Sequence, residues 1–96
     1  MIKNKLSGLY LISDESLIDQ SKYFDFLDDA LSAKPSIFQL RIKGSPKEEI
    51  LYKAKELRKY MNEKQKLVGL FVNADFNVIS HITELLELDV IQLHGD

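Results

Sequence analysis

The seven residues FQLRIKG, at positions 38–44, decide the predicted fold of this chain. Apolar and polar side chains alternate along them, which is typical of a β-strand with one buried face. Strand-like and helix-like segments alternate along the rest of the chain, and a parallel sheet built in this way is covered by helices rather than by solvent. The polar side chains Gln39, Arg41 and Lys43 must therefore face a space that is enclosed but wet. The mouth of a β/α barrel is such a space.

Three further strands and three helices are predicted around this segment. Strands are expected at residues 8–13, 37–42, 67–72 and 89–93, and the first helix at residues 22–33 after a polar loop at 14–21. Ser45 is expected to cap the second helix, with Pro46 at its first position and Glu48 completing a capping box. Lys53 falls on the charged face of that helix and is expected in solvent, and Asp75 is expected to cap the third helix.

The order β-α-β-α-β-α-β, with short connections and right-handed crossovers, predicts the (βα)₃β half of a TIM (β/α)₈ barrel. This is an α/β fold with parallel strands in sequence order, and residues 1–96 would form a single truncated barrel domain. A compact four-stranded α/β sandwich is the alternative. In the half-barrel, the first and fourth strands are open edges, and such edges invite pairing with another chain.

Composition excludes several classes of function. The formal net charge of -2 gives no general attraction to nucleic acid or to anionic membranes, so neither is expected as a partner. The chain has no cysteine, which excludes disulfides and thiolate metal sites. No apolar run approaches the roughly 20 residues that span a bilayer, and the first residues do not resemble a signal peptide. A cytoplasmic protein is therefore expected.

The candidate binding residues lie where the strands end, because active sites of β/α barrels are built at the C-terminal strand ends. Arg41 and Lys43 are two residues apart and point the same way, which suits a phosphate or pyrophosphate group. Gly44 is expected to give a ligand access to the backbone, and the N-terminus of the next helix lies just beyond. The alternative is that Lys43 extends into solvent and that Arg41 pairs with a neighbouring carboxylate.

Other polar residues at the strand ends are ambiguous. Asn73 can orient a ligand by its amide or serve as a turn residue before the third helix. His94 can act as an acid or base, although a lone histidine beside a glycine is more often structural. Asp14 and Asp96 are possible metal ligands, but aspartates are common in loops.

Three segments together carry a resemblance to a known family. Residues 8–14 (GLYLISD), 39–43 (QLRIK) and 71–73 (FVN) resemble the N-terminal half of thiamine phosphate synthase and its thiazole tautomerase relatives. The resemblance implies a transferase of thiamine biosynthesis that joins a pyrimidine diphosphate to a thiazole phosphate and releases pyrophosphate, with Mg²⁺ as cofactor. It also implies that Gln39, Arg41, Lys43 and Asn73 bind the pyrimidine diphosphate. Ala74 stands where that family has a magnesium-binding aspartate, and Asp96 is at best a displaced substitute for a second one.

A second resemblance competes with the first. Residues 68–73 (VGLFVN) and 88–96 (LDVIQLHGD) look like phosphoribosylanthranilate isomerase of tryptophan biosynthesis. That family begins with a strand that carries a catalytic cysteine, which this chain lacks, so the thiamine family is the expected one. Either family implies a phosphate-binding barrel.

Both resemblances cover only half of a barrel, so the chain alone is expected to be inactive. A complementing second half-barrel chain, or self-association of this one, is the expected partner. A non-catalytic, self-associating half-barrel is the remaining alternative.

Overall fold

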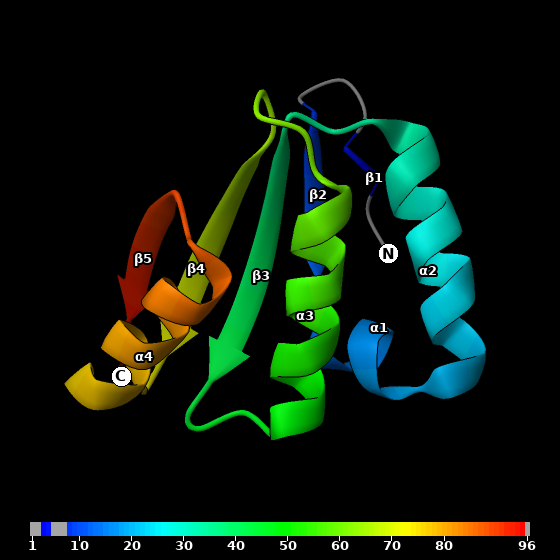
Figure 1. Ribbon diagram of the computed structural model, residues 1–96. Helices are drawn as coiled ribbons and strands as arrows, with labels where there is room; N and C mark the ends of the chain where they lie inside the picture. Colours follow the sequence, from blue (N-terminus) through cyan, green and yellow to red (C-terminus); the bar gives the residue numbers. More distant parts are fainter. Residues whose placement is uncertain (1–2, 5–7, 96) are drawn as a thin grey trace.

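A computed structural model of the protein describes residues 3–4 and 8–95 and shows one five-stranded sheet with helices beside it (Figure 1). The elements follow in the order β1 (Lys3–Asn4), β2 (Leu9–Ile12), α1 (Asp14–Ile18), α2 (Gln20–Ala33), β3 (Ile37–Lys43), α3 (Glu48–Tyr60), β4 (Lys66–Val72), α4 (Phe76–Leu86) and β5 (Val90–His94). None of the helices in the described part of the chain combines the length and apolar character needed to cross a bilayer.

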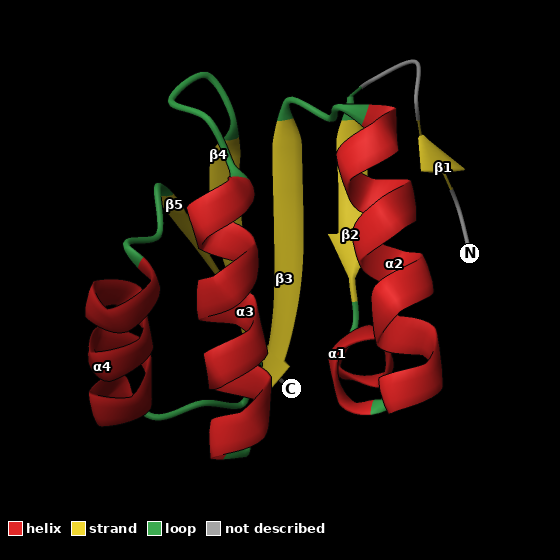
Figure 2. Cartoon of the chain, turned by 45° about the vertical axis from the view of Figure 1, so that its right-hand side comes forward, coloured by secondary structure: helices red, strands yellow, loops and turns green. Residues whose placement is uncertain are grey.

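The predicted half-barrel is confirmed. Strands β2, β3, β4 and β5 are parallel and lie side by side in sequence order. The helices lie together on one face of the sheet (Figure 2). The opposite face, which we call the helix-free face, would line the interior of a closed barrel.

Strand β3 shows why the sheet has two unlike faces. Phe38, Leu40 and Ile42 are at most 2% exposed and belong to the core between the sheet and the helices. Burial of each such side chain contributes about 1.5–3 kcal/mol. Gln39 is half-buried and Arg41 is exposed, because both alternate onto the helix-free face.

Backbone pairing continues past the ends of the regular strands. Gly44 N–H donates to the Val72 carbonyl at 2.9 Å, and Asn73 N–H donates to the His94 carbonyl at 3.1 Å. These bonds hold the C-terminal ends of β3, β4 and β5 in register, so side chains at those ends have defined positions. They also correct one prediction, because the Gly44 amide is engaged by β4 and is not offered to a ligand.

The first helical region differs from the prediction. Residues 14–18 form helix α1, not part of a loop, and α2 begins at Gln20, not at residue 22. Ser13 Oγ accepts a hydrogen bond from Ser16 N–H at 3.3 Å at the start of α1, and Leu17 is fully buried in the core. Two adjacent apolar residues, Leu17 and Ile18, in an otherwise polar segment give too weak a helical pattern to be predicted.

Helix starts were predicted with mixed success. Asp75 caps α4 as expected, with its carboxylate accepting from Val78 N–H at 2.9 Å. The prediction for α3 was wrong: Lys47 is the N-cap residue, no side chain caps the helix, and Ser45 lies two residues before it. The extended backbone at Lys47 starts the helix two residues later than the capping motif indicates.

Strand β1 was not predicted at all. It pairs antiparallel with β2, with Lys3 opposite Tyr10 and Asn4 opposite Leu9. The expected open edge at β2 is therefore partly covered. Among the described strands, β5 is paired on one side only, so its outer edge is open as expected.

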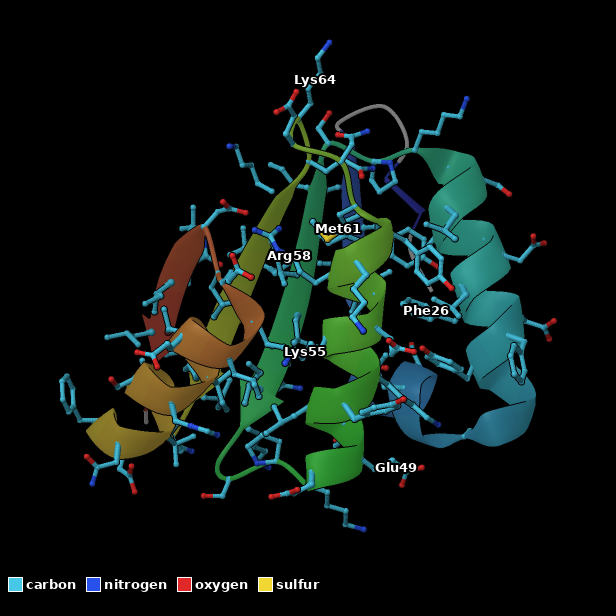
Figure 3. The ribbon with its side chains drawn as sticks, in the orientation of Figure 1. Phe26, Glu49, Lys55, Arg58, Met61 and Lys64 are labelled. Carbon is cyan, nitrogen blue, oxygen red and sulfur yellow. The ribbon has the colours of Figure 1, made fainter. Side chains whose placement is uncertain are left out.

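A polar cluster ties α3 to the start of β5. The Asp89 carboxylate accepts from Leu67 N–H at 2.8 Å and forms an ion pair with Arg58 at 3.2 Å. Arg58 reaches this point from α3 (Figure 3) and also donates to the Glu87 carbonyl at 2.8 Å. The hydrogen bond from Leu67, followed by the Arg58 charge, lowers the pKa of Asp89 against an opposing effect of burial.

Candidate functional site

The register of the strands decides which side chains share the helix-free face. Gln39 is level with Val68 and Val90, Arg41 with Leu70 and Gln92, and Lys43 with Val72 and His94. Along each strand, these residues alternate with residues that face the helices. The polar residues of β3 and β5 therefore flank an apolar β4 on one surface.

Gln39 and Gln92 are joined across β4. Gln39 Nε2 donates to Gln92 Oε1 at 2.6 Å. Gln92 lies two residues beyond Val90, the residue level with Gln39, so the bond runs diagonally over two strands. In a barrel of about eight strands with a shear number of about eight, residues at the same height shift by about one position from each strand to the next. The side chains of one interior layer come from alternate strands. The Gln39–Gln92 bond therefore lies within one interior layer of such a barrel.

Arg41 and Lys43 border a cavity of about 100 Å³ at the C-terminal ends of β2 and β3. Ser13 and Asp14 line it from the β2 side, and Ile50 of α3 forms part of its wall. Both cationic side chains are exposed, and neither forms an ion pair with a carboxylate of the described residues. The alternative in which Arg41 is neutralised by a neighbouring carboxylate has no support within that part of the chain.

The start of α3 contributes less to anion binding than expected. Its first turn carries Glu48 and Glu49, whose negative charges oppose a further anion at that helix end. Attraction for an anion at this edge therefore rests on the side chains of Arg41 and Lys43, and not on the helix.

Asn73 occupies a turn with left-handed backbone geometry, at a φ of 53°. Asparagine tolerates this conformation better than most residues. Its side chain is exposed directly after β4, so a contact with a ligand stays a prediction. Ala74, the next residue, packs against the core.

Asp14 and Asp96 were considered as metal ligands, and magnesium was expected from the thiamine family. Asp96 lies outside the described residues. Among residues 3–4 and 8–95, no group of three or more His, Asp or Glu side chains is arranged to hold a metal ion. Binding of magnesium stays a prediction of that resemblance alone.

A larger cavity, of about 420 Å³, lies at the opposite ends of the strands near Ser36. Its polar groups are largely occupied by one another: Gln65 Nε2 donates to the Pro35 carbonyl at 2.9 Å, and Gln65 Oε1 accepts from Asn62 N–H at 2.9 Å. Lys64 at its rim extends away from the sheet (Figure 3). This end of a β/α barrel supports stability more than chemistry, so we take the smaller cavity as the site.

Lys53 was wrongly placed in solvent by its helical spacing. It is buried, its Nζ lies 4.7 Å from the centre of the Tyr23 ring, and Glu49 is 3.5 Å away. No hydrogen-bond partner satisfies that Nζ atom within the described structure. The residue lies among the helices, away from the helix-free face. His81, in contrast, is exposed on α4 as predicted.

Comparison with known proteins gives a consistent result. A family model described as N-(5'phosphoribosyl)anthranilate (PRA) isomerase matches residues 17–96. The N-(5'-phosphoribosyl)anthranilate isomerase of Clostridium acetobutylicum is 29% identical over 96 residues, and that of Caldanaerobacter subterraneus subsp. tengcongensis is 31% identical over 96 residues. Both alignments cover 100% of this chain and 41% of the relative. The isomerase of Bacillus subtilis is 41% identical over 44 residues, which cover 43% of this chain and 20% of the relative. No solved structure gives a significant match.

These matches correct the expected family. Thiamine phosphate synthase, its place in thiamine biosynthesis and its transferase activity were wrong, and the resemblance to phosphoribosylanthranilate isomerase is confirmed. The short motif at residues 39–43 does not distinguish between the two families, because alternating polar residues on a barrel strand are shared by many phosphate-binding barrels. Residues 68–73 and 88–96 had indicated the family that the comparisons support.

Proposed function

We propose that this chain, which belongs to the N-(5'-phosphoribosyl)anthranilate isomerase family, forms the substrate-binding N-terminal half of an isomerase-type barrel. The chain spans 41% of the length of its first two curated relatives, which bear the name of this isomerase. The proposal rests above all on the helix-free face, where cationic and amide side chains gather at the C-terminal strand ends.

The compound in the family's name, N-(5'-phosphoribosyl)anthranilate, carries two anionic groups, the phosphate on its ribose and the carboxylate on its anthranilate ring. Arg41 and Lys43 supply two cations side by side on one strand. Guanidinium and ammonium groups suit carboxylate and phosphate oxygens. We propose that Gln39, Arg41, Lys43 and Asn73 contact this ligand.

We do not expect this chain alone to isomerise the ligand. The family resemblance implies a catalytic cysteine on the first barrel strand, and this chain contains no cysteine. At the end of β2 it has Ser13 and Asp14 instead. Binding without isomerisation is the expected behaviour.

The partner is proposed from the state of β5. Ile91 and Leu93 point toward the helix side of the sheet and are 42% and 69% exposed, while the outer edge of β5 has no partner among the described strands. A further parallel strand followed by a helix would cover both features. We propose that four more βα units, in a complementing half-barrel, close the structure there. Self-association of this chain through the same edge is the alternative.

The binding proposal is tested with an anthranilate that carries a ribose 5-phosphate on its nitrogen, followed by the anisotropy of its anthranilate fluorescence. We expect saturable binding that weakens about tenfold or more in Arg41→Gln and Lys43→Gln, because each loses a charged hydrogen bond. Lys55→Gln, which removes an exposed lysine from α3, is the matched control and should bind normally. No saturable binding, or equal weakening in all three variants, would reject the proposal.

A further inference from the structure

We propose that His94 and Arg41 hold one oxyanion between them, across β4, so that His94 is a ligand-binding residue. The inference rests on the proposed function only for the identity of that oxyanion, which is the carboxylate or the phosphate of the substrate. Its geometry stands on the register of the sheet.

The Gln39–Gln92 bond shows which side chains can meet across β4. His94 is displaced from Arg41 as Gln92 is displaced from Gln39, by two strands and two residues toward the C-terminal ends. At that displacement two glutamine side chains meet at 2.6 Å. An arginine is longer than a glutamine, and an imidazole reaches about as far. Arg41 and His94 can therefore reach a common point above β4, one step closer to the barrel mouth.

Arg41 and His94 do not suit each other as partners. A guanidinium has only donors, and an imidazole has at least one N–H. Neither side chain has a hydrogen-bonding or ionic partner within the described residues. Two donors that can reach a common point and have no acceptor there suit an anionic one, and Lys43, level with His94, adds a third donor.

The backbone under this point is well defined. Val72, level with Lys43 and His94, is buried although it lies on the helix-free face. The His94 carbonyl accepts from Asn73 N–H, which fixes the end of β5 beside β4. A ligand bound here would contact a sheet surface whose backbone is already held in place.

The balance of charge at this edge is favourable for an anion. Asp14 lines the cavity beside Arg41 and Lys43 and offsets one positive charge. Asp75 follows β4, but its carboxylate accepts from Val78 N–H as the cap of α4. Two cations and an imidazole therefore face one uncommitted carboxylate among the described residues there.

The chain contains two histidines, which makes the test simple. The imidazole carbon-bound proton signals of the whole chain are recorded by NMR during titration with sodium phosphate and, separately, with anthranilate, at constant pH and ionic strength. His81→Gln assigns the two sets of signals. His81, exposed on α4, is the internal control.

We expect the His94 signals to shift saturably with at least one of the two anions, while the His81 signals stay in place. The anion that binds more tightly identifies the group that the site takes. In Arg41→Gln the affinity read from His94 should fall about tenfold or more. In Lys55→Gln it should not change.

Unshifted His94 signals, equal shifts at both histidines, or an affinity unaffected by Arg41→Gln would overturn the inference. Its failure is separable from that of the proposed function. If the phosphoribosyl compound binds while His94 stays silent, the inference fails and the function stands. If either simple anion shifts His94 but the phosphoribosyl compound does not bind, the function fails and the oxyanion site stands.

Discussion

Gln39 on β3 donates a hydrogen bond to Gln92 on β5 across the full width of β4, at 2.6 Å. Because the two residues belong to alternate strands of one sheet, the bond marks a polar interior layer of a barrel, a place that branched apolar residues usually fill. It places two amides directly below Arg41 and His94. The polar face of β3 is thus matched by β5 and does not simply point into solvent.

The energetic coupling of this pair is measurable in a double-mutant cycle. We expect Gln39→Met and Gln92→Met each to change the free energy of unfolding by less than about 1 kcal/mol, because the bond is exposed. The coupling between them should be about 0.5 kcal/mol. Urea unfolding of the four proteins gives this value, and additive effects would show that the bond does not persist in solution.

Asp89 is expected to make folding sensitive to acid. Its pKa is lowered in the folded state, so its contribution is present above the unfolded value of about 4 and is lost as the pH falls through the folded pKa. Asp89→Ala also leaves Leu67 N–H without its acceptor and should cost about 1–2 kcal/mol at neutral pH.

The matching measurement is urea unfolding at several pH values from 7 downward to about 3. The loss of stability at acid pH should be smaller in Asp89→Asn than in the wild type. Asp28→Asn, an exposed change on α2, serves as the control. An identical acid profile for Asp89→Asn and the wild type would exclude this role for Asp89.

Lys53 sets two effects against each other. Its ammonium group lies over the Tyr23 ring, an attraction worth about 0.5–2 kcal/mol, and its ion pair with the exposed Glu49 adds about 0.3–0.5 kcal/mol, but burial of a charge without a hydrogen bond costs several kcal/mol. The cost is the larger effect, so Lys53→Met should leave the stability unchanged or raise it by about 1 kcal/mol. Thermal unfolding decides this, and a clear loss of stability would mean that Lys53 is satisfied in solution.

The open edge of β5 predicts association between chains. We expect the isolated chain to associate reversibly, and Leu93→Asp to reduce that association, since Leu93 is exposed on the helix side of this edge. Phe24→Asp is the matched control, because Phe24 is 64% exposed on α2, which follows β2 on the other side of the sheet. Sedimentation equilibrium distinguishes the two. A wild-type chain that stays monomeric at high concentration contradicts the expectation.

Much of the fold could be predicted because local pattern and burial agree. The alternation of Phe38, Leu40 and Ile42 with polar neighbours marks β3 and its two faces, and Asp75 marks the start of α4. Helix α1 was not predicted because Leu17, which the structure buries in the core, stands in a segment too short and polar to show a helical pattern. The start of α3 was predicted wrongly at Ser45. A capping motif shows that a sequence can cap a helix, but it does not show where the backbone enters the helix.

The site was predictable in part. Strand ends and polar alternation identified Gln39, Arg41 and Lys43 as residues of one face, which the register confirms. The proposed pairing of His94 with Arg41 needed the register between β4 and β5, a long-range property that no local pattern contains. The family was misjudged for a related reason, because a short motif at residues 39–43 was preferred to longer matches at 68–73 and 88–96.

The central claim, that a phosphoribosyl anthranilate binds at the C-terminal ends of the strands, is tested most directly by mapping backbone amide shifts. The isotope-labelled chain is titrated with the ribose 5-phosphate derivative of anthranilate, and each amide is followed by NMR. We predict saturable shifts concentrated at residues 13–14, 41–44, 72–74 and 92–95. Shifts concentrated near Ser36, Lys66 and Asp89 at the opposite ends, or no saturable shifts at all, would contradict the account.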